Sequence, residues 1–260
     1  MSPETCSPRH PPRPDAGPEL GVLQIEADKV WNLDGKRGEG IVVASGDTGV
    51  EWTHPALKGK YRGWNGATAS HDFNWFDAIE DTAEPIRRQQ PRLAHHRHDG
   101  GRRRRWAIRS ASRRGAMDRL PEHELRRRAA FNVHRVQSVL PRAVPHGGDP
   151  ETDGDPSKAP DIVNNSWECP PTEGCDLVVL KASFSALRAA GILAVAGAGN
   201  NGPNCSTVST PPAIYDEAFV VGATDMTEVL ASFSSRGPVT IDGSGRPRPD
   251  VVAPGVGVRS

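Results

Sequence analysis

Four short apolar segments, each bounded by glycine or polar residues, predict the strands of a buried sheet. They span residues 41–46, 161–166, 191–196 and 218–222, and most are rich in Val, Ile and Ala. A continuous apolar run of this length is typical of a strand covered on both faces, as in parallel sheets. The first run, Ile-Val-Val-Ala-Ser-Gly at 41–46, is therefore expected to be buried on both faces.

Apolar residues at helical spacing predict helices between and before these strands. Residues 177–190 carry Leu177, Leu180, Phe184 and Leu187 and stop at Gly191. A shorter amphipathic helix is expected at residues 27–31, ending near Gly35. A strand, a helix and a second strand joined by short links form a βαβ unit. The pattern therefore predicts one α/β domain with a mostly parallel sheet flanked by helices.

Two segments depart from this globular pattern. Residues 1–20 hold six prolines among Ser, Gly and charged residues, which predicts a disordered leader. Residues 87–146 contain 17 Arg, no Lys, four acidic residues and six of the nine His, although the whole chain is formally neutral. We therefore expect a domain at 21–260 that contains an anomalous Arg-rich segment at 87–146. We find no signal-peptide pattern at the N-terminus and no apolar run of membrane-spanning length.

Polar residues follow three of the predicted strands, at the carboxyl edge where functional groups collect in open parallel sheets. They are Asp47, the pair Ser166-Trp167, and the stretch Gly-Ala-Gly-Asn-Asn-Gly at 197–202. An isolated Asp at a strand end would indicate a turn or a helix cap. The 197–202 stretch could likewise be an ordinary Asn-Gly turn. Its small residues also let a ligand approach the backbone, and the Asn200 amide could then donate to a developing oxyanion.

Five motifs in chain order resemble the subtilisin-like serine peptidases, and the bacillopeptidase F-like members in particular. The motifs are Val43–Val50 with His54-Pro55, Val163–Trp167, Ala196–Pro203, Phe233–Pro238 and Pro249–Gly255. The resemblance covers roughly 21–86 and 147–260. It implies a subtilisin-like three-layer fold, incomplete in this chain, and a secreted bacterial serine endopeptidase that acts as a monomer. It implies no cofactor for the chemistry, and structural calcium at sites that the sequence does not identify.

The resemblance also implies roles for individual residues. Asp47 would orient a His base, and Asn200 would donate to the oxyanion. Two segments would pair with an extended polypeptide substrate and wall the pocket for the residue before the cut: Ser166 with Trp167, and Gly197, Ala198 and Gly199. Glu168 departs from the family, which usually has Gly there, and its carboxylate would either narrow the pocket or favour basic residues.

The chain lacks the motifs for two of the three triad members. The family's order is Asp, His, Ser, yet neither a His-Gly-Thr-His nor a Gly-Thr-Ser-Met type motif occurs. Ser260 lacks the residues that flank the family's nucleophile, so it is not a candidate. His95 and His96 are surrounded by Arg and Pro, which argues against either as the catalytic His. We expect a chain truncated before its nucleophile and inactive as written, either a peptide-binding fragment or a pseudogene product.

The missing His motif can be found in another reading frame. Residues 87–98, Arg-Arg-Gln-Gln-Pro-Arg-Leu-Ala-His-His-Arg-His, can be encoded so that reading one base later gives Asp-Asp-Asn-Ser-His-Gly-Ser-His-Thr-Thr-Gly. Only third bases are free in this construction, which makes a chance match of this length improbable. We hypothesise a frame-shifted gene, with the His motif out of frame beneath Pro91 and Arg92 and the frame restored by about Gly147.

Two rival interpretations of the Arg-rich segment explain less. An arginine arm built on 102–105 and 126–128, with Trp106, would bind nucleic acid through phosphates. A metal cluster could use His95, His96 and His98, but it has only Asp99 as an acidic neighbour. A frame shift accounts for both the arginines and the missing His, so nucleic acid is not an expected partner.

The cysteines match no common zinc-site spacing. Cys169 and Cys175 bracket a Pro-Pro-Thr-Glu-Gly loop. They could close a small disulfide ring in an exported protein or remain two free thiols.

Overall fold

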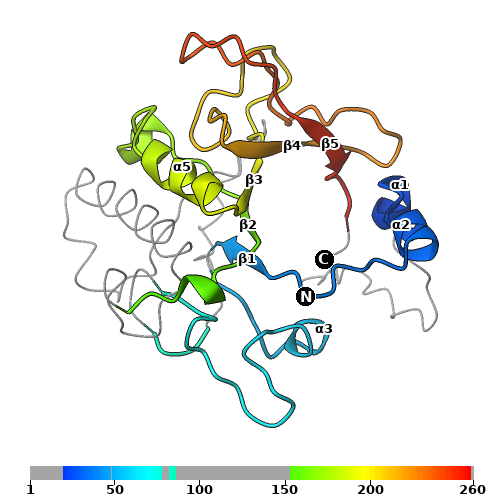
Figure 1. The fold of residues 1–260 in the computed structure, drawn as a ribbon. Helices are drawn as coiled ribbons and strands as arrows, with labels where there is room; N and C mark the ends of the chain where they lie inside the picture. The colour runs from blue at the N-terminus through cyan, green and yellow to red at the C-terminus, as the bar shows by residue number, and fades with distance from the viewer. Residues whose placement is uncertain (1–19, 48, 78–81, 86–152, 259–260) are drawn as a thin grey trace, which may run out of the picture.

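The structure, a computed structural model, describes residues 20–47, 49–77, 82–85 and 153–258 (Figure 1). Nearly all of the expected leader and the whole Arg-rich segment lie outside these residues, as do His95, His96, His98 and Ser260. Among the described residues, none of the helices has the length and hydropathy of a membrane span.

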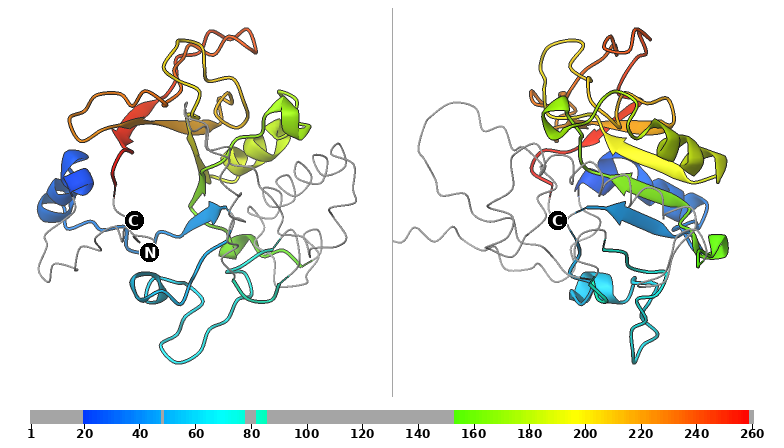
Figure 2. Two further views of the ribbon diagram at one scale, coloured as in Figure 1. Left: turned by 180° about the vertical axis from the view of Figure 1, so that it is seen from behind. Right: turned by 90° about the vertical axis from the view of Figure 1, so that its left-hand side faces the viewer.

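Five parallel strands form one sheet in the order β1-β2-β3-β4-β5. The right-hand view of Figure 2 shows them stacked in chain order, from blue β1 to red β5. Their bounds are β1 Val43–Gly46, β2 Ile162–Asn165, β3 Leu193–Gly197, β4 Ala218–Thr224 and β5 Val251–Pro254. The predicted fold class, α/β with a parallel sheet and flanking helices, is confirmed.

Short helices accompany the sheet. They are α1 Leu20–Gln24, α2 Ala27–Leu33, α3 Pro55–Lys58 and α5 Lys181–Ala189, with 3-10 turns η1 Pro156–Lys158 and η2 Pro171–Glu173. Helix α5 packs on one face of the sheet, where Phe184 and Leu187 are fully buried with Val163 and Val220. Helix α1 contacts β5 instead: a Cβ on Gly21 would lie 3.6 Å from the Pro254 Cβ. Two helices therefore pack against the sheet, α5 on one face and α1 at β5.

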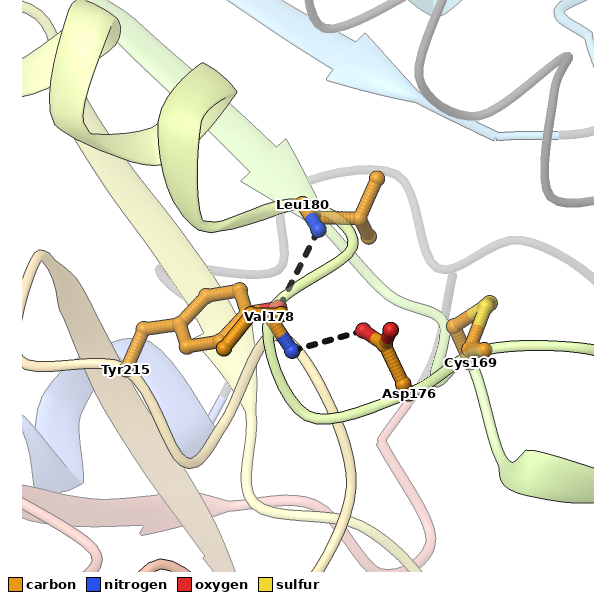
Figure 3. Close-up of a disulfide and its surroundings, with 6 residues drawn as sticks. Cys169, Asp176, Val178, Leu180 and Tyr215 are labelled. Atoms are coloured by element: carbon orange, nitrogen blue, oxygen red, sulfur yellow. Dashed lines mark hydrogen bonds between the residues drawn. A yellow bond between two sulfur atoms is a disulfide. The ribbon is translucent and has the colours of Figure 1, made fainter.

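The helix predicted at 177–190 begins later than its apolar pattern suggested, at Lys181. Two hydrogen bonds hold the preceding residues in turns (Figure 3). The Asp176 carboxylate accepts from the Val178 N–H at 2.9 Å, and the Leu180 N–H donates to the Tyr215 hydroxyl oxygen at 3.2 Å. Leu180 is thus buried in the core, and Leu177 and Val179 pack against it without being helical, whereas Val178 is 66% exposed. The helix expected at 27–31 is found as α2, and it buries none of its residues.

The expectation that the first strand is buried on both faces was wrong. In β1 the Val43 side chain is 63% exposed. Strand β1 lies at the edge of the described sheet and pairs with β2 alone. The described helices that pack on the sheet contact β3 and β5. The apolar run therefore predicted the position of the strand correctly, but not how far its side chains are exposed to solvent. Strand β5 was not predicted, and Val251 and Val252 on it are also about half exposed.

Candidate active site

The sheet register brings three polar segments to one edge. Gly46 is paired with Asn165, and Asn165 with Ala196, so the last residues of β1 and β2 lie level with the next-to-last residue of β3. The next residues along the chain are Asp47 and Ser166, both exposed, beside Gly197, the exposed last residue of β3. Neighbouring strands are about 4.8 Å apart, so these segments are close neighbours. The strand pairing places these three segments together at the carboxyl edge of the sheet, as expected.

Ser235, which is fully inaccessible to solvent, holds the loop after β3 at residues 198–202 in place. Its N–H donates to the Gly199 carbonyl at 3.1 Å, and its hydroxyl accepts from the Asn201 N–H at 2.9 Å. Gly199 has φ +100°, and a Cβ there would lie 2.9 Å from the Ser235 Oγ. Backbone angle and space both require glycine at this position. Asn200 is exposed, and Ser235 fixes the residues on both sides of it, Gly199 and Asn201.

The same supporting segment fastens the end of this loop. The Gly202 N–H donates to the Phe233 carbonyl at 2.9 Å, and a Cβ on Gly202 would meet the Ser234 carbonyl oxygen at 2.3 Å. The Ser234 hydroxyl accepts from the Ala223 N–H of β4 at 3.0 Å. The sequence alone marks Phe233–Pro238 only as a family motif, and its support of this loop is visible only in the structure. Two adjacent serines before Arg-Gly-Pro gave no local sign of being buried.

On the opposite side, the chain leaving β2 is fixed by a disulfide. Cys169 and Cys175 are joined, their Cα atoms are 5.7 Å apart, and each is 3% exposed (Figure 3). The Cys169 N–H also donates to the Pro211 carbonyl at 2.9 Å. Trp167 is buried, at 8% exposure, while Ser166 accepts a hydrogen bond from the Asn164 amide at 2.8 Å. The segment from Ser166 to Cys169 is therefore tethered at both ends.

Glu168 links the two sides. Its Oε2 accepts from the Thr210 hydroxyl at 3.0 Å and from the Asn201 side-chain amide at 3.5 Å. The same oxygen lies 3.6 Å from the position of a Cβ on Gly199. The half-buried carboxylate thus extends from the β2 side to the loop after β3.

Two other polar groups near these segments, the Tyr215 hydroxyl and the Ala198 N–H, already have partners within the fold. Burial raises the pKa of Tyr215 to about 12, against the opposing effect of the Leu180 N–H that donates to it. The Ala198 N–H donates to the Val221 carbonyl at 2.9 Å and is therefore used within the sheet. Among the described residues, no group of three or more His, Cys, Asp or Glu side chains could hold a metal ion. The calcium sites implied by the family resemblance remain unassigned.

Comparison with known proteins decides the family. The model of the subtilase family matches residues 131–259. Bacillopeptidase F of Bacillus subtilis (strain 168) is 36% identical over 267 residues, which cover 94% of this chain and 17% of that protein. Residues 131–259 belong to the subtilase family. The family match begins at residue 131, inside the Arg-rich segment, whereas the motifs had placed the return of the resemblance at about residue 147.

Parts of this chain are also similar to another curated protein and to solved structures. A thermophilic serine proteinase of Bacillus sp. (strain AK1) is 27% identical over 247 residues, which cover 94% of this chain and 51% of that protein. Among solved structures, an S41 psychrophilic protease is 26% identical over 36% of this chain and 31% of its own, with a TM-score of 0.28. The chain thus spans between about a sixth and a half of the length of these curated relatives.

Proposed function

We propose that this chain is the substrate-binding part of the catalytic domain of a secreted serine endopeptidase, and that these 260 residues bind an extended polypeptide without cleaving it. The family is one of serine endopeptidases. The observation that carries the proposal is the register of β1, β2 and β3, which gathers Asp47, Ser166 and Gly197 at one edge of the sheet.

Each proposed role follows from chemistry available at that edge. An extended substrate would run between the segment Ser166–Glu168 and the segment Gly197–Gly199 and pair with their backbones. The Asn200 amide would donate to the oxygen that becomes negative during acyl transfer. Asp47 would accept from a His base, hold its tautomer and stabilise the imidazolium that forms. The domain would act as a monomer on its polypeptide substrate.

Cleavage would need two groups whose family motifs these residues do not contain. Neither the His-Gly-Thr-His nor the Gly-Thr-Ser-Met type motif occurs in the sequence. In subtilisin, loss of either Ser or His lowers turnover by about a million-fold. Asp47 and Asn200 alone would therefore leave binding with no useful hydrolysis.

Two findings support a secreted parent enzyme. The buried disulfide between Cys169 and Cys175 is typical of proteins that fold in an oxidising compartment. The relatives that the chain matches include bacillopeptidase F, at 36% identity.

Binding is tested by the fluorescence anisotropy of a short extended peptide that carries a dye. Gly197→Val is the informative variant, because a Cβ at Gly197 meets nothing within 4 Å, so the new side chain occupies only the proposed substrate path. Gly59→Val is the matched control, because Gly59 is exposed with equally open surroundings after α3, a part of the chain not proposed to contact substrate.

We expect saturable binding by the unmodified chain, with affinity weakened by about tenfold or more in Gly197→Val and unchanged in Gly59→Val. Mass spectrometry of the peptide should show no cleavage. Absence of binding by the unmodified chain, or equal weakening by both substitutions, would contradict the proposed site.

A further inference from the structure

We propose that Glu168 makes the substrate pocket select a basic side chain, Arg or Lys, in the residue immediately before the scissile bond. The inference rests on the proposed function, because it takes the segments at 166–168 and 197–199 as the walls that hold the substrate.

The position of the carboxylate is the first step. Glu168 begins on one wall, and its Oε2 reaches the other, 3.6 Å from where a Cβ on Gly199 would be. Thr210 and Asn201 hold that oxygen at 3.0 and 3.5 Å. The disulfide at the next residue, Cys169, fixes the backbone from which the side chain extends. A side chain that enters between the two walls therefore meets this carboxylate in a defined place.

The charge of Glu168 is the second step. Its two donors, a hydroxyl and an amide, are neutral, and no ion pair in the described part of the chain includes Glu168. Other carboxylates here do have cationic partners, such as Glu217 with Lys181 at 2.6 Å. Within the same part, Oε1 of Glu168 accepts no hydrogen bond. A carboxylate can accept about four hydrogen bonds, so Glu168 retains acceptor capacity for a guanidinium or an ammonium group.

The cost of the alternatives is the third step. A carboxylate in the pocket could instead act only by narrowing it, which would favour small side chains. Any neutral side chain that covered Glu168 would remove water from a charge that has no cation, and this is unfavourable whatever the width of the pocket. An acidic side chain would add repulsion. A neutral donor such as an amide could give the carboxylate a hydrogen bond but would leave its charge unpaired. A basic side chain replaces the lost water and also pairs the charge.

The test compares two peptides that differ by one charge. Dye-labelled Ala-Ala-Pro-Arg amide and its citrulline analogue have nearly the same shape, and only the first is cationic. We expect the unmodified 260-residue chain to bind the Arg peptide about tenfold more tightly, the scale of one charge-assisted hydrogen bond. Glu168→Gln keeps an oxygen for Thr210 and Asn201 but removes the charge. It should abolish the preference, because Arg loses its ionic partner and citrulline no longer covers an unpaired charge.

Two further variants complete the design. Glu228→Gln removes an equal charge from an exposed turn after β4 and should keep the tenfold preference. Glu168→Lys should reverse the preference, so that a Glu peptide binds more tightly than the Arg peptide, and it gives a second test if Glu168→Gln does not fold.

The outcomes separate the two proposals. Equal binding of the Arg and citrulline peptides by the unmodified chain, or an Arg preference that survives Glu168→Gln, would overturn the role of Glu168 and leave peptide binding intact. Failure of both peptides to bind would overturn the proposed function, and the role of Glu168 with it.

Discussion

Substituting Gly199 by Ala should destabilise the protein far more than the same change two residues earlier, at Gly197. Gly199 has φ +100°, and its Cβ would lie 2.9 Å from the Oγ of the fully buried Ser235. Gly197 has no neighbour within 4 Å of its Cβ position and no positive φ. The two glycines belong to one candidate binding segment, so their comparison isolates the support beneath Asn200.

The expected magnitude has two parts. An L-residue in this region of backbone space costs about 1–3 kcal/mol. Relief of the contact requires the Ser235 hydroxyl to move, which weakens the 2.9 Å hydrogen bond from the Asn201 N–H and adds about 1 kcal/mol. We therefore expect Gly199→Ala to lower the free energy of unfolding by about 2–4 kcal/mol, and Gly197→Ala to change it by less than about 0.5 kcal/mol.

Urea denaturation followed by circular dichroism measures both values, with an unchanged slope as evidence that the same transition is compared. A double-mutant cycle with Ser235→Ala tests the stated cause, because removal of the hydroxyl should relieve about 1 kcal/mol of the cost of Gly199→Ala. Equal effects of the two glycine substitutions would refute the steric reasoning. Strict additivity in the cycle would refute the role of Ser235.

Three further predictions concern the disulfide, the tyrosines and the gene. Replacing both cysteines of the disulfide by Ala should lower the free energy of unfolding by about 2 kcal/mol in urea denaturation, as expected for so small a ring, and a change below about 0.5 kcal/mol would contradict this. Burial raises the pKa of both tyrosines, Tyr61 and Tyr215, to about 12. Phenolate absorbance in the folded protein should therefore appear well above pH 10, and stability should fall as pH rises from about 10 towards 12, because unfolded tyrosines release their protons first; ordinary titration near pH 10 would count against it. The coding DNA of residues 87–98, sequenced directly, should encode the His motif one base later, and third bases incompatible with Asp-Asp-Asn-Ser-His-Gly-Ser-His would exclude the frame shift.

The sheet was predictable from sequence because its strands are short apolar runs closed by glycine or polar residues. Strand β2 at Ile162–Asn165 and strand β3 at Leu193–Gly197 fall within one or two residues of their expected ends. Periodicity carries no information about which strand lies at the edge, so the exposure of Val43 was missed. The start of α5 depends on a hydrogen bond between Leu180 and Tyr215, which are 35 residues apart, and no local pattern encodes that contact.

For the candidate site too, one part could be predicted from the sequence and another part depends on contacts between distant residues. The meeting of Asp47, Ser166 and Gly197 follows from the rule that parallel strands present their carboxyl ends at one edge, and it could be stated in advance. The partners that give these residues their surroundings come from distant positions. Ser235 lies 34 residues from the N–H that it binds, and Thr210 lies 42 residues from Glu168. The function of Glu168 could therefore be framed as two alternatives from the sequence and argued further only with the structure.

The central proposal is that these 260 residues have the substrate-binding edge of a serine endopeptidase but no activated serine nucleophile. Intact-mass spectrometry after incubation with a fluorophosphonate serine probe tests it most directly, with bacillopeptidase F as the reactive control. The account predicts that the mass of the 260-residue chain stays unchanged while the control is modified. A stoichiometric adduct on this chain would show an activated serine and contradict the claim.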